Sequence, residues 1–540
     1  MRAKRVSSTR TPIYRDAGFL LGDIPTMKQA FADEHNHPHS PNSYIYSRYR
    51  NPNVVAAEEM IMEMENAQWS LLTQSGMAAI DVALSVFQTK ENTGKWLFFT
   101  EIYGGTNSFI DKVLINRRGI DIIRFAPEGD DYSLEHYVNI LETHKPSVVF
   151  FEAISNPMLI TVDGAEIIKL AKQHGAKVIV DNTFATPMLW QPLNDGADIV
   201  IHSATKYMAG HGNLSAGVVS GNDPELAKQA IEYRKWVGHM LSPDEAYRLE
   251  DMLKTFNLRF TQHCSNAFAI AQYLDSHTMI EKVLYPGLPS HPTHANAIKM
   301  LENKGYGAIV TFDIKGKDWA EKETRCKRFI EILAHQIPLV PTLGDADTIL
   351  MPIEAVWGDK FPFPGMIRLS VGIEDVTNLI SSIVPISSEG IDITGDFNIY
   401  NNKLFQLMYL TAENALLVYP NENGLSGSVR VRVTTLNGIV NECNIIVFAP
   451  LVYDAYRDDP AIGTKMAYVE LLNPYNESVF DRTYYNYIVR KAVGSNSIAI
   501  TRVFDAMISD YSTLESIVMS TNGEIYLKMH NFILKNDVPT

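Results

Sequence analysis

The segment Ile199–Asn213 combines the residue types that a Schiff-base site needs. An apolar run typical of a strand ends at His202, and two hydroxyl residues, Ser203 and Thr205, stand just before Lys206. A lysine there can condense with an aldehyde while the hydroxyls bind a phosphate, and pyridoxal 5'-phosphate (PLP) carries both groups. A lysine after a strand is more often a solvated loop residue, so the segment indicates a PLP site only together with other motifs.

Asp181 is the second part of this pattern. It ends the apolar run Lys177–Asp181 and lies 25 residues before Lys206, a spacing that fits one turn, one helix and one strand. Both side chains would then lie at the same edge of adjacent strands. A carboxylate there can pair with the protonated pyridine nitrogen of PLP and keep the ring an electron sink. The alternative is an aspartate that caps a helix.

Two motifs are suited to a phosphate. Ser75-Gly76-Met77 opens an amphipathic helix whose backbone amides can bind an anion, although an ordinary capped helix begins in the same way. Tyr46 and Arg48 are two residues apart in a segment of extended character, where both side chains point to one side and can clamp a phosphate. Loop arginines are mostly solvated, so this second motif is weak by itself.

Tyr103 and Arg368 add groups for the cofactor ring and the substrate. Tyr103 stands on a glycine-rich turn directly after a strand, where its ring can stack on a flat cofactor or pack against a neighbour. Arg368 lies in the short strand Met366–Val371. From there its guanidinium can bind a carboxylate in bidentate fashion or pair with an acidic side chain.

Composition excludes several other classes of protein. The chain has 540 residues, 46% hydrophobic and 20% charged, which predicts a globular protein of two or three domains. A net charge of −15 argues against binding to nucleic acid or an anionic membrane. Three distant cysteines support neither a disulfide scaffold nor a metal site, and no apolar run is long enough to span a membrane. We expect a protein of the reducing cytoplasm.

Between about residues 55 and 225, short apolar runs alternate with longer amphipathic ones. The runs typical of strands are Trp96–Thr100, Ile120–Phe125, Ser147–Glu152, Lys177–Asp181, Asp198–His202 and Ala216–Ser220. The runs that predict helices are Met77–Gln88, Asn107–Asn116, Leu134–Thr143 and Ala165–His174. Buried strands separated by helices indicate an α/β fold with a mostly parallel sheet, in which ligands bind at the carboxyl ends of the strands.

A smaller α+β section is expected after this sheet. Two long helices are predicted first, at Pro224–Trp236 and Pro243–Leu274. Strands at Ala308–Asp313 and Met366–Val371 and helices at Trp319–Leu333 and Glu374–Val384 follow. The first forty or so residues, rich in proline and histidine, are predicted to be an extended arm.

The composition changes after about residue 385. Ser387–Gly390 is a plausible linker, and the strands expected beyond it are Ser426–Thr434, Asn444–Phe448, Tyr484–Arg490, Ser497–Val503 and Glu524–Met529. We therefore expect an N-terminal arm (1–55), a large PLP-binding domain (56–245), a small α+β domain (246–385) and an accessory, mainly β domain of unknown role (390–540).

Together, the motifs resemble those of the Cys/Met-metabolism PLP-dependent enzymes, the transsulfuration group. This family includes cystathionine γ-synthase, cystathionine γ- and β-lyases, methionine γ-lyase and O-acetylhomoserine sulfhydrylase. The resemblance covers about Thr11 to Val384 in the family's order and spacing. Its blocks are Thr11–Tyr14, Tyr46–Arg48, Ser75–Ala79, Tyr103–Thr106, Ser155–Pro157, Asp181–Pro187, His202–Tyr207 and Ile367–Glu374.

The resemblance implies a PLP-dependent transferase of fold type I that forms a homotetramer from tight dimers. It implies that Lys206 forms the Schiff base and later moves protons, that Asp181 binds the pyridine nitrogen, and that Tyr103 stacks on the ring and assists proton transfer. Further cofactor-binding residues are expected at Ser75, Gly76, Met77, Thr183, Ser203 and Thr205.

For the substrate, the resemblance implies that Arg368 binds the α-carboxylate, with Asn156 and Thr342 nearby. Tyr46 and Arg48 resemble the pair that reaches the phosphate from the partner subunit, and Tyr46 is also expected to contact the substrate. Dimerisation would then be a condition of activity.

Some positions depart from the family pattern. Asn213 replaces a usual acidic residue, and Thr342 is preceded by Pro341 rather than by an acidic residue suited to the distal ammonium group of cystathionine. The segment Ile353–Trp357 lacks the common Thr-His pair, and the turn at Tyr103 lacks the cysteine frequent in bacterial methionine γ-lyases. The position before Thr342 therefore favours a small or uncharged γ-substituent.

We expect a PLP-dependent γ-elimination, a C–S lyase reaction on methionine-like sulfur amino acids that gives 2-oxobutanoate, ammonia and a thiol. In it, the freed amine of Lys206 removes the α-proton, and a second proton loss at Cβ expels the γ-substituent. One alternative is a γ-replacement synthase of the cystathionine γ-synthase or O-acylhomoserine sulfhydrylase type. Another is a catalytically inactive scaffold with a C-terminal binding module.

Overall fold

The computed structural model describes residues 9–36, 42–302, 304–334 and 336–383, together with the backbone of nine strands between residues 405 and 529. The chain divides into two compact units, Met1–Leu379 and Ile380–Thr540. Within the described residues, no helix is long and apolar enough to cross a membrane. All of the predicted site residues belong to the first unit.

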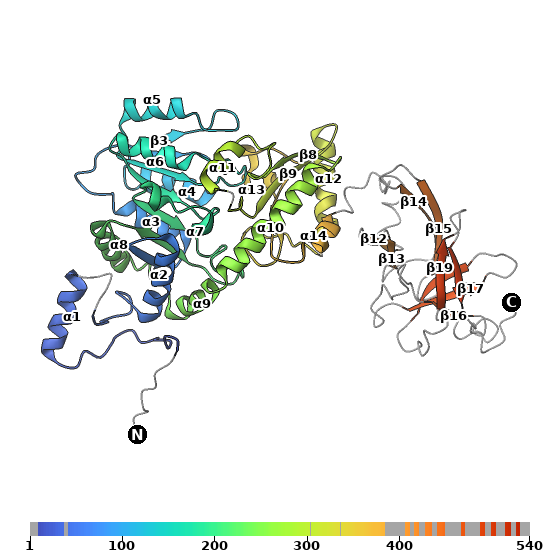
Figure 1. Cartoon of the computed structure of the whole chain (residues 1–540), viewed down its shortest axis with the longest axis horizontal. Helices are drawn as coiled ribbons and strands as arrows, with labels where there is room; N and C mark the ends of the chain where they lie inside the picture. Colours follow the sequence, from blue (N-terminus) through green and yellow to red (C-terminus); the bar gives the residue numbers. More distant parts are fainter. Residues whose placement is uncertain are drawn as a thin grey trace, which may run out of the picture. The chain divides into compact units, whose positions relative to one another are not determined.

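A seven-stranded sheet has the order β1-β7-β6-β5-β4-β2-β3 and forms the centre of the first unit. Figure 1 shows the helices that surround this sheet. Neighbouring strands among β2 to β6 are parallel, whereas β7 is antiparallel to both of its neighbours. The predicted, mostly parallel sheet is therefore confirmed, although β1 was not predicted. The strands are β1 (Trp69–Thr73), β2 (Trp96–Phe99), β3 (Ile122–Phe125), β4 (Val148–Glu152), β5 (Lys177–Asp181), β6 (Ile199–His202) and β7 (Gly217–Gly221).

Side chains explain why these segments are strands. Every residue of β2, β4 and β6 is buried, and Val, Ile and Phe dominate them, as expected for strands covered on both faces. Phe99 lies at the centre of an aromatic cluster, with ring centroids 4.9 Å from Phe125 and 5.5 Å from Phe151. This cluster packs around β2, β3 and β4 at one side of the sheet, whose carboxyl edge carries the candidate site.

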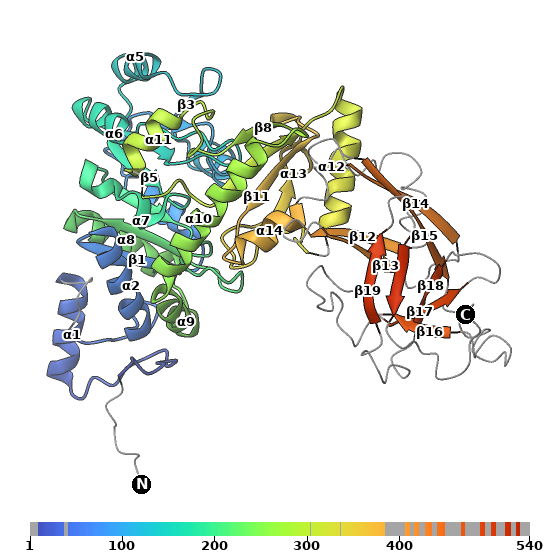
Figure 2. The same ribbon diagram turned by 45° about the vertical axis from the view of Figure 1, so that its right-hand side comes forward.

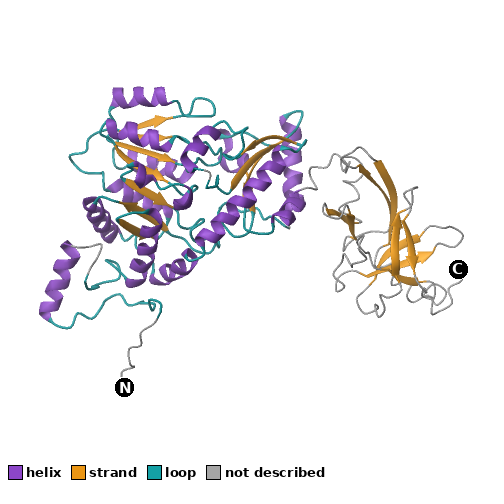
Figure 3. Ribbon diagram, in the orientation of Figure 1, coloured by secondary structure: helices purple, strands orange, loops and turns teal. Residues whose placement is uncertain are grey.

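Helices cover the sheet (Figure 3). They are α2 (Pro52–Glu65), α3 (Gly76–Ser85), α4 (Gly104–Phe109), η1 (Ile110–Ile115), α5 (Leu134–His144), α6 (Gly164–Gln173), α7 (Thr186–Leu189), η2 (Pro192–Asp195) and α8 (Pro224–Val237). The helix predicted at Asn107–Asn116 falls on two elements, α4 and η1, the second of which is a π-helix. Side-chain caps at Ser75, Ser133 and Asp163 begin α3, α5 and α6.

A second, antiparallel sheet has the order β10-β11-β9-β8 and packs with α10 and α12 (Figure 2). Its strands are β8 (Ile280–Leu284), β9 (Ile309–Ile314), β10 (Ile349–Pro352) and β11 (Met366–Ser370). The helices of this part are α9 (Pro243–Leu253), α10 (Phe256–Asp275), α11 (His294–Leu301), α12 (Trp319–Leu333), α13 (Ile353–Trp357), η3 (Gly358–Lys360) and α14 (Val376–Ile383).

Two expectations about helices were wrong. The arm contains a helix, α1 (Ile24–Asn36), which begins where the Asp23 carboxylate accepts a hydrogen bond from the Thr26 amide at 2.8 Å. The helix predicted at Pro243–Leu274 is broken between α9 and α10. The carbonyl of Met252 accepts hydrogen bonds from the Thr255 hydroxyl at 3.3 Å and the Arg259 guanidinium at 2.9 Å, which satisfies it at the break.

Beyond residue 383, the described part of the chain consists of strands in three sheets, β12-β13, β14-β15-β18-β17-β16 and β19-β20. They are β12 (Phe405–Leu410), β13 (Ala415–Pro420), β14 (Gly427–Thr434), β15 (Val440–Phe448), β16 (Met466–Val469), β17 (Asn486–Lys491), β18 (Ile498–Val503), β19 (Leu514–Met519) and β20 (Ile525–Met529). The five strands predicted here overlap β14, β15, β17, β18 and β20, and the predicted linker at Ser387–Gly390 lies outside the described residues.

Candidate active site

The carboxyl ends of β4, β5 and β6 lie side by side. In the parallel register Glu152 is opposite Asp181, and Asp181 is opposite Ile201, one residue before the end of β6. Lys206 follows four residues after that end, in a tight turn. The structure therefore brings Asp181 and Lys206 to one edge of the sheet, as their spacing predicts.

Lys206 is half-buried, and its Nζ donates a hydrogen bond to the Thr342 hydroxyl at 2.9 Å. Burial and the charge of Arg368 lower its pKa to about 8. A substantial fraction of this amine is therefore neutral near physiological pH, which is the form that attacks an aldehyde or accepts a proton.

Arg368 is buried on β11 and has only neutral hydrogen-bond partners among the contacts described. Its Nη1 donates to Asn156 Oδ1 at 3.1 Å and its Nη2 donates to the Thr342 carbonyl at 2.6 Å, while its buried Nε lacks a partner in the described structure. Burial lowers its pKa to about 10. A buried guanidinium without a bonded carboxylate is suited to bind an anionic ligand.

Asp181 is buried, and its two described hydrogen bonds fall on the same oxygen. Oδ1 accepts from the Thr183 amide at 3.0 Å and from the Thr183 hydroxyl at 2.6 Å, and that hydroxyl in turn accepts from the Ser203 amide at 2.9 Å. Burial raises the pKa of Asp181, while the Thr183 bonds oppose the rise. This chain of contacts joins the ends of β5 and β6 and fits a carboxylate held ready for a ring nitrogen.

The start of α3 packs tightly against the turn before Lys206. A Cβ on Gly76 would lie 2.9 Å from both Cβ and Oγ of Ser203, so only glycine allows this approach. The amides of Gly76 and Met77 at the beginning of α3 and the Ser203 hydroxyl therefore lie close together, which fits a phosphate. Met77 is the second residue of the same helix and is half-buried.

Two of the predicted phosphate ligands already have partners within the chain. The Ser75 hydroxyl caps α3 by accepting from the Ala78 amide at 3.1 Å. The Thr205 hydroxyl donates to the Ala216 carbonyl at 3.1 Å and accepts from the Ala216 amide at 3.0 Å. Since a hydroxyl has one proton to donate, the side chain of Thr205 is a weaker candidate for phosphate binding than that of Ser203.

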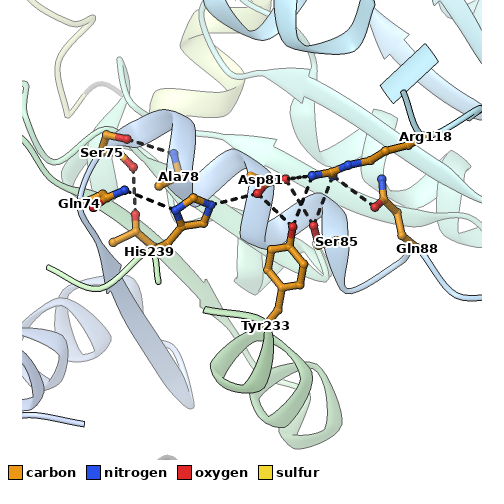
Figure 4. Close-up of polar contacts among 10 residues, drawn as sticks. Gln74, Ser75, Ala78, Asp81, Ser85, Gln88, Arg118, Tyr233 and His239 are labelled. Carbon is orange, nitrogen blue, oxygen red and sulfur yellow. Dashed lines mark hydrogen bonds and ion pairs between the residues drawn. The ribbon is translucent and has the colours of Figure 1, made fainter. Parts of the chain in front are cut away.

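A polar network contacts α3 and the residue before its cap (Figure 4). Asp81 accepts hydrogen bonds from Arg118 at 2.7 Å, Tyr233 at 3.1 Å and His239 at 3.0 Å. The other ring nitrogen of His239 lies 3.5 Å from the amide of Gln74, the residue before Ser75. Local sequence patterns do not predict this network, because its members come from three distant stretches of the chain, around residues 74–81, at residue 118 and around residues 233–239.

Tyr103 lies at the N-cap position of α4, with its ring half exposed. Its amide donates to Glu152 Oε1 at 2.5 Å, and a Cβ on Gly105 would lie 2.4 Å from the ring carbon Cε1. Burial and the charge of Asp181 raise the pKa of Glu152 well above its usual value. Glu152 thus positions Tyr103 at this edge of the sheet, a role that the sequence motifs do not indicate.

Among the contacts of the described residues, neither Tyr46 nor Arg48 touches Lys206. The Arg48 guanidinium donates to the Lys235 carbonyl at 2.6 Å, at the end of α8, and lies 5.5 Å from the centre of the Tyr46 ring. Tyr46 is exposed. Their expected placement in a partner subunit's site remains a prediction.

Two of the positions that depart from the family pattern, Pro341 and Asn213, are exposed. Pro341 is exposed directly before the half-buried Thr342, and Asn213 is exposed with its carbonyl accepting from Arg248 at 3.0 Å.

Comparison with known proteins identifies the first unit. The Cys/Met metabolism PLP-dependent enzyme family matches residues 2–384. A cystathionine beta-lyase of Lactococcus lactis subsp. cremoris (strain MG1363) is 34% identical over 354 residues, 64% of this chain and 88% of that protein. An L-methionine gamma-lyase of Fusobacterium nucleatum subsp. polymorphum is 34% identical over 387 residues, 69% of this chain and 91% of that protein.

Solved structures show the same fold. Cystathionine gamma synthase from Xanthomonas oryzae pv. oryzae, in complex with aminoacrylate and cysteine, matches with a TM-score of 0.61 and 27% identity over 69% of this chain and 92% of that one. Cystathionine gamma-lyase from Lactobacillus plantarum, complexed with L-serine, matches with a TM-score of 0.60 and 29% identity. The match covers 70% of this chain and 93% of that one.

Proposed function

Because the chain belongs to the Cys/Met-metabolism PLP-dependent enzymes, we propose that it is a C–S lyase that eliminates the γ-substituent of methionine-like amino acids. The products are 2-oxobutanoate, ammonia and a thiol. PLP is the cofactor of this family, and when bound it supplies the electron sink that makes the protons at Cα and Cβ of an amino acid acidic.

The observation that carries this proposal is the charge around Thr342. Its hydroxyl and carbonyl contact two basic groups, Lys206 and Arg368. The preceding residue, Pro341, carries no charge. A substrate with a distal ammonium group would meet repulsion here, whereas an uncharged thioether would not. The similarity to L-methionine gamma-lyase adds support.

We assign roles at the substrate to four residues of this chain. Arg368, oriented by Asn156, binds the α-carboxylate through its guanidinium. With the cofactor bound, the Nζ of Lys206 would hold it in the resting enzyme, and as a free amine this Nζ would accept the proton from Cα of the substrate. Thr342 keeps this amine in position through the hydrogen bond to Nζ.

The remaining residues hold the cofactor. Asp181, fixed by Thr183, pairs with the ring nitrogen, and Tyr103 stacks on the ring. The amides at the start of α3, with Ser203, bind the phosphate. We further propose that Tyr46 and Arg48 serve the site of a partner subunit in a homotetramer, since their contacts within one chain lie at the end of α8.

A γ-replacement synthase is the second candidate, because solved cystathionine gamma synthase matches the first unit over 92% of its length. Elimination and replacement share the same steps up to departure of the γ-substituent, and differ in whether a thiol then adds. The contacts that the protein makes after the γ-substituent has left therefore decide between elimination and replacement.

Product analysis separates these candidates. The full-length holoenzyme is incubated with L-methionine, L-cystathionine or O-acetylhomoserine, with and without cysteine, and the products are followed by mass. We expect 2-oxobutanoate from L-methionine, independent of added thiol. Cystathionine formed from O-acetylhomoserine and cysteine, without release of 2-oxobutanoate from methionine, favours replacement. A purified protein that takes up PLP but converts none of the three contradicts both.

A further inference from the structure

Trp357 lies over the guanidinium group of Arg368. It is the last residue of α13, it is half-buried, and the Arg368 Cζ is 5.9 Å from the centre of its ring. The segment from Ile353 to Trp357 is the one that departs from the family pattern by lacking a Thr-His pair. The ring therefore occupies a position at the substrate end of the site that the family motifs do not assign.

The geometry of the guanidinium group determines which N–H donors of Arg368 remain available when the Trp357 ring covers its face. Carboxylates bind the N–H groups at the edge of the guanidinium plane, whereas aromatic rings cover its face. The Nη atoms of Arg368 contact Asn156 and Thr342. With Trp357 on its face, Arg368 still has donors at its edge for a carboxylate, so the ring and the carboxylate can be accommodated together.

Met158 extends this apolar surface. Trp357 and Met158 are both partly buried and pack against one cluster, formed by Ile353, Phe361 and Met366. Met158 lies two residues after Asn156, which contacts Arg368 directly. An aromatic ring and a flexible thioether, both adaptable apolar groups, therefore flank the residues proposed to bind the α-carboxylate.

The same short segment also reaches the loop of Tyr103. Lys360, three residues after Trp357, donates to the Thr100 carbonyl at 3.2 Å and lies 3.3 Å from the Glu101 carboxylate. Residues 353–360 thus extend from Arg368 to the loop that carries the ring-stacking tyrosine. A substrate held between those two groups would have this segment beside its side chain.

We propose that Trp357 and Met158 form the apolar surface against which the γ-substituent of the substrate packs, so that they select uncharged, apolar thioether amino acids. This inference rests on the proposed function, because it assigns the substrate's carboxylate to Arg368. Trp357 is a specificity-determining residue through contact with the substrate side chain.

The test measures how tightly two unreactive amino acids bind to the full-length holoenzyme. Binding is monitored through the change in cofactor absorbance. L-norleucine has the methionine skeleton with a methylene in place of sulfur, and L-alanine lacks the side chain beyond Cβ. We expect Trp357→Ala to weaken L-norleucine binding about tenfold or more and L-alanine binding less than about twofold. Trp357→Phe, which keeps a ring, should fall between the wild type and Trp357→Ala.

Trp319→Ala is the matched control, because Trp319 is exposed at the start of α12, and it should change neither affinity. If Trp357→Ala does not fold with cofactor, Met158→Ala tests the same surface and should show the same selectivity. Equal weakening of both ligands, or weakening of neither, overturns the inference. A wild type that prefers L-norleucine to L-alanine but releases no 2-oxobutanoate from L-methionine contradicts the proposed function alone.

Discussion

The amine of Lys206 and the hydroxyl of Thr342 are joined by a hydrogen bond of 2.9 Å, although they are 136 residues apart in the chain. Gly344 makes this contact possible, because a Cβ there would lie 2.7 Å from the Tyr207 nitrogen and 2.9 Å from the Lys206 carbonyl carbon. The bond links the loop before β10 to the turn after β6. The reactive amine is therefore positioned by both sheets of the first unit.

Capture of PLP by the cofactor-free protein should depend on pH. Because burial lowers the pKa of Lys206 to about 8, its amine is protonated and unreactive below that pH and neutral above it. The rate of cofactor binding, followed by absorbance between about pH 6 and about pH 10, should rise with pH and level off above about 8. A midpoint near 10.5, the ordinary lysine value, would contradict the burial of this amine.

Thr342→Val should move that midpoint to lower pH. The Thr342 hydroxyl accepts a hydrogen bond from Nζ and so favours the charged ammonium form. Thr342→Ser, which keeps the hydroxyl, is the matched control and should leave the midpoint in place. The same midpoint in both variants would show that the hydrogen bond has no effect on protonation.

Arg368→Lys should raise the KM for L-methionine about tenfold to a hundredfold, because an ammonium group cannot reproduce the bidentate fork that binds a carboxylate. The cofactor absorbance should stay unchanged, since Arg368 contacts Asn156 and Thr342 rather than the proposed cofactor ligands. Loss of the cofactor band with an unaltered KM would be the opposite of this expectation.

Gly76→Ala should weaken PLP binding about tenfold or more through overpacking against Ser203, and weaken binding of pyridoxal, which lacks the phosphate, much less. Gly104→Ala is the comparison, because a Cβ at Gly104 meets no atom within 4 Å. Equal losses of affinity for PLP and for pyridoxal would show that the phosphate does not bind at Gly76.

Arg118→Ala should lower the thermal stability of the first unit. Its guanidinium donates to Asp81 at 2.7 Å and to Gln88 at 3.2 Å, and removing it leaves a buried carboxylate with fewer donors, at a cost of about 2 kcal/mol. Arg117→Ala removes an exposed neighbour and should leave the melting temperature within error. Equal melting temperatures for the two variants would contradict a stabilising role of the Asp81 network.

The parts of the fold set by local pattern were predictable from sequence. The apolar runs ending at Asp181 and His202 and the spacing between Asp181 and Lys206 predicted adjacent strand ends, and β5 and β6 are paired in that way. Trp319–Leu333 was predicted with its observed ends, since α12 begins at the capping residue Asp318.

Contacts between distant segments were not predictable from the same patterns. At the break between α9 and α10, Arg259 binds the carbonyl of Met252, and it also binds the carbonyls of Tyr207 and Met208, about fifty residues earlier. The position of Trp357 over Arg368 likewise follows from packing of α13 on β11 and has no periodic signal. Single-chain geometry also leaves the expected role of Tyr46 and Arg48 as a prediction.

Chemical trapping of the cofactor tests the central claim most directly. The holoenzyme is reduced with borohydride, digested and mapped by mass, with Lys206→Ala treated in parallel. The structure predicts the pyridoxyl mass on the peptide that contains Lys206 and its absence from the variant. A label on another lysine, or a variant that keeps the cofactor band and is labelled equally, would contradict the assignment of Lys206 and of the site built around it.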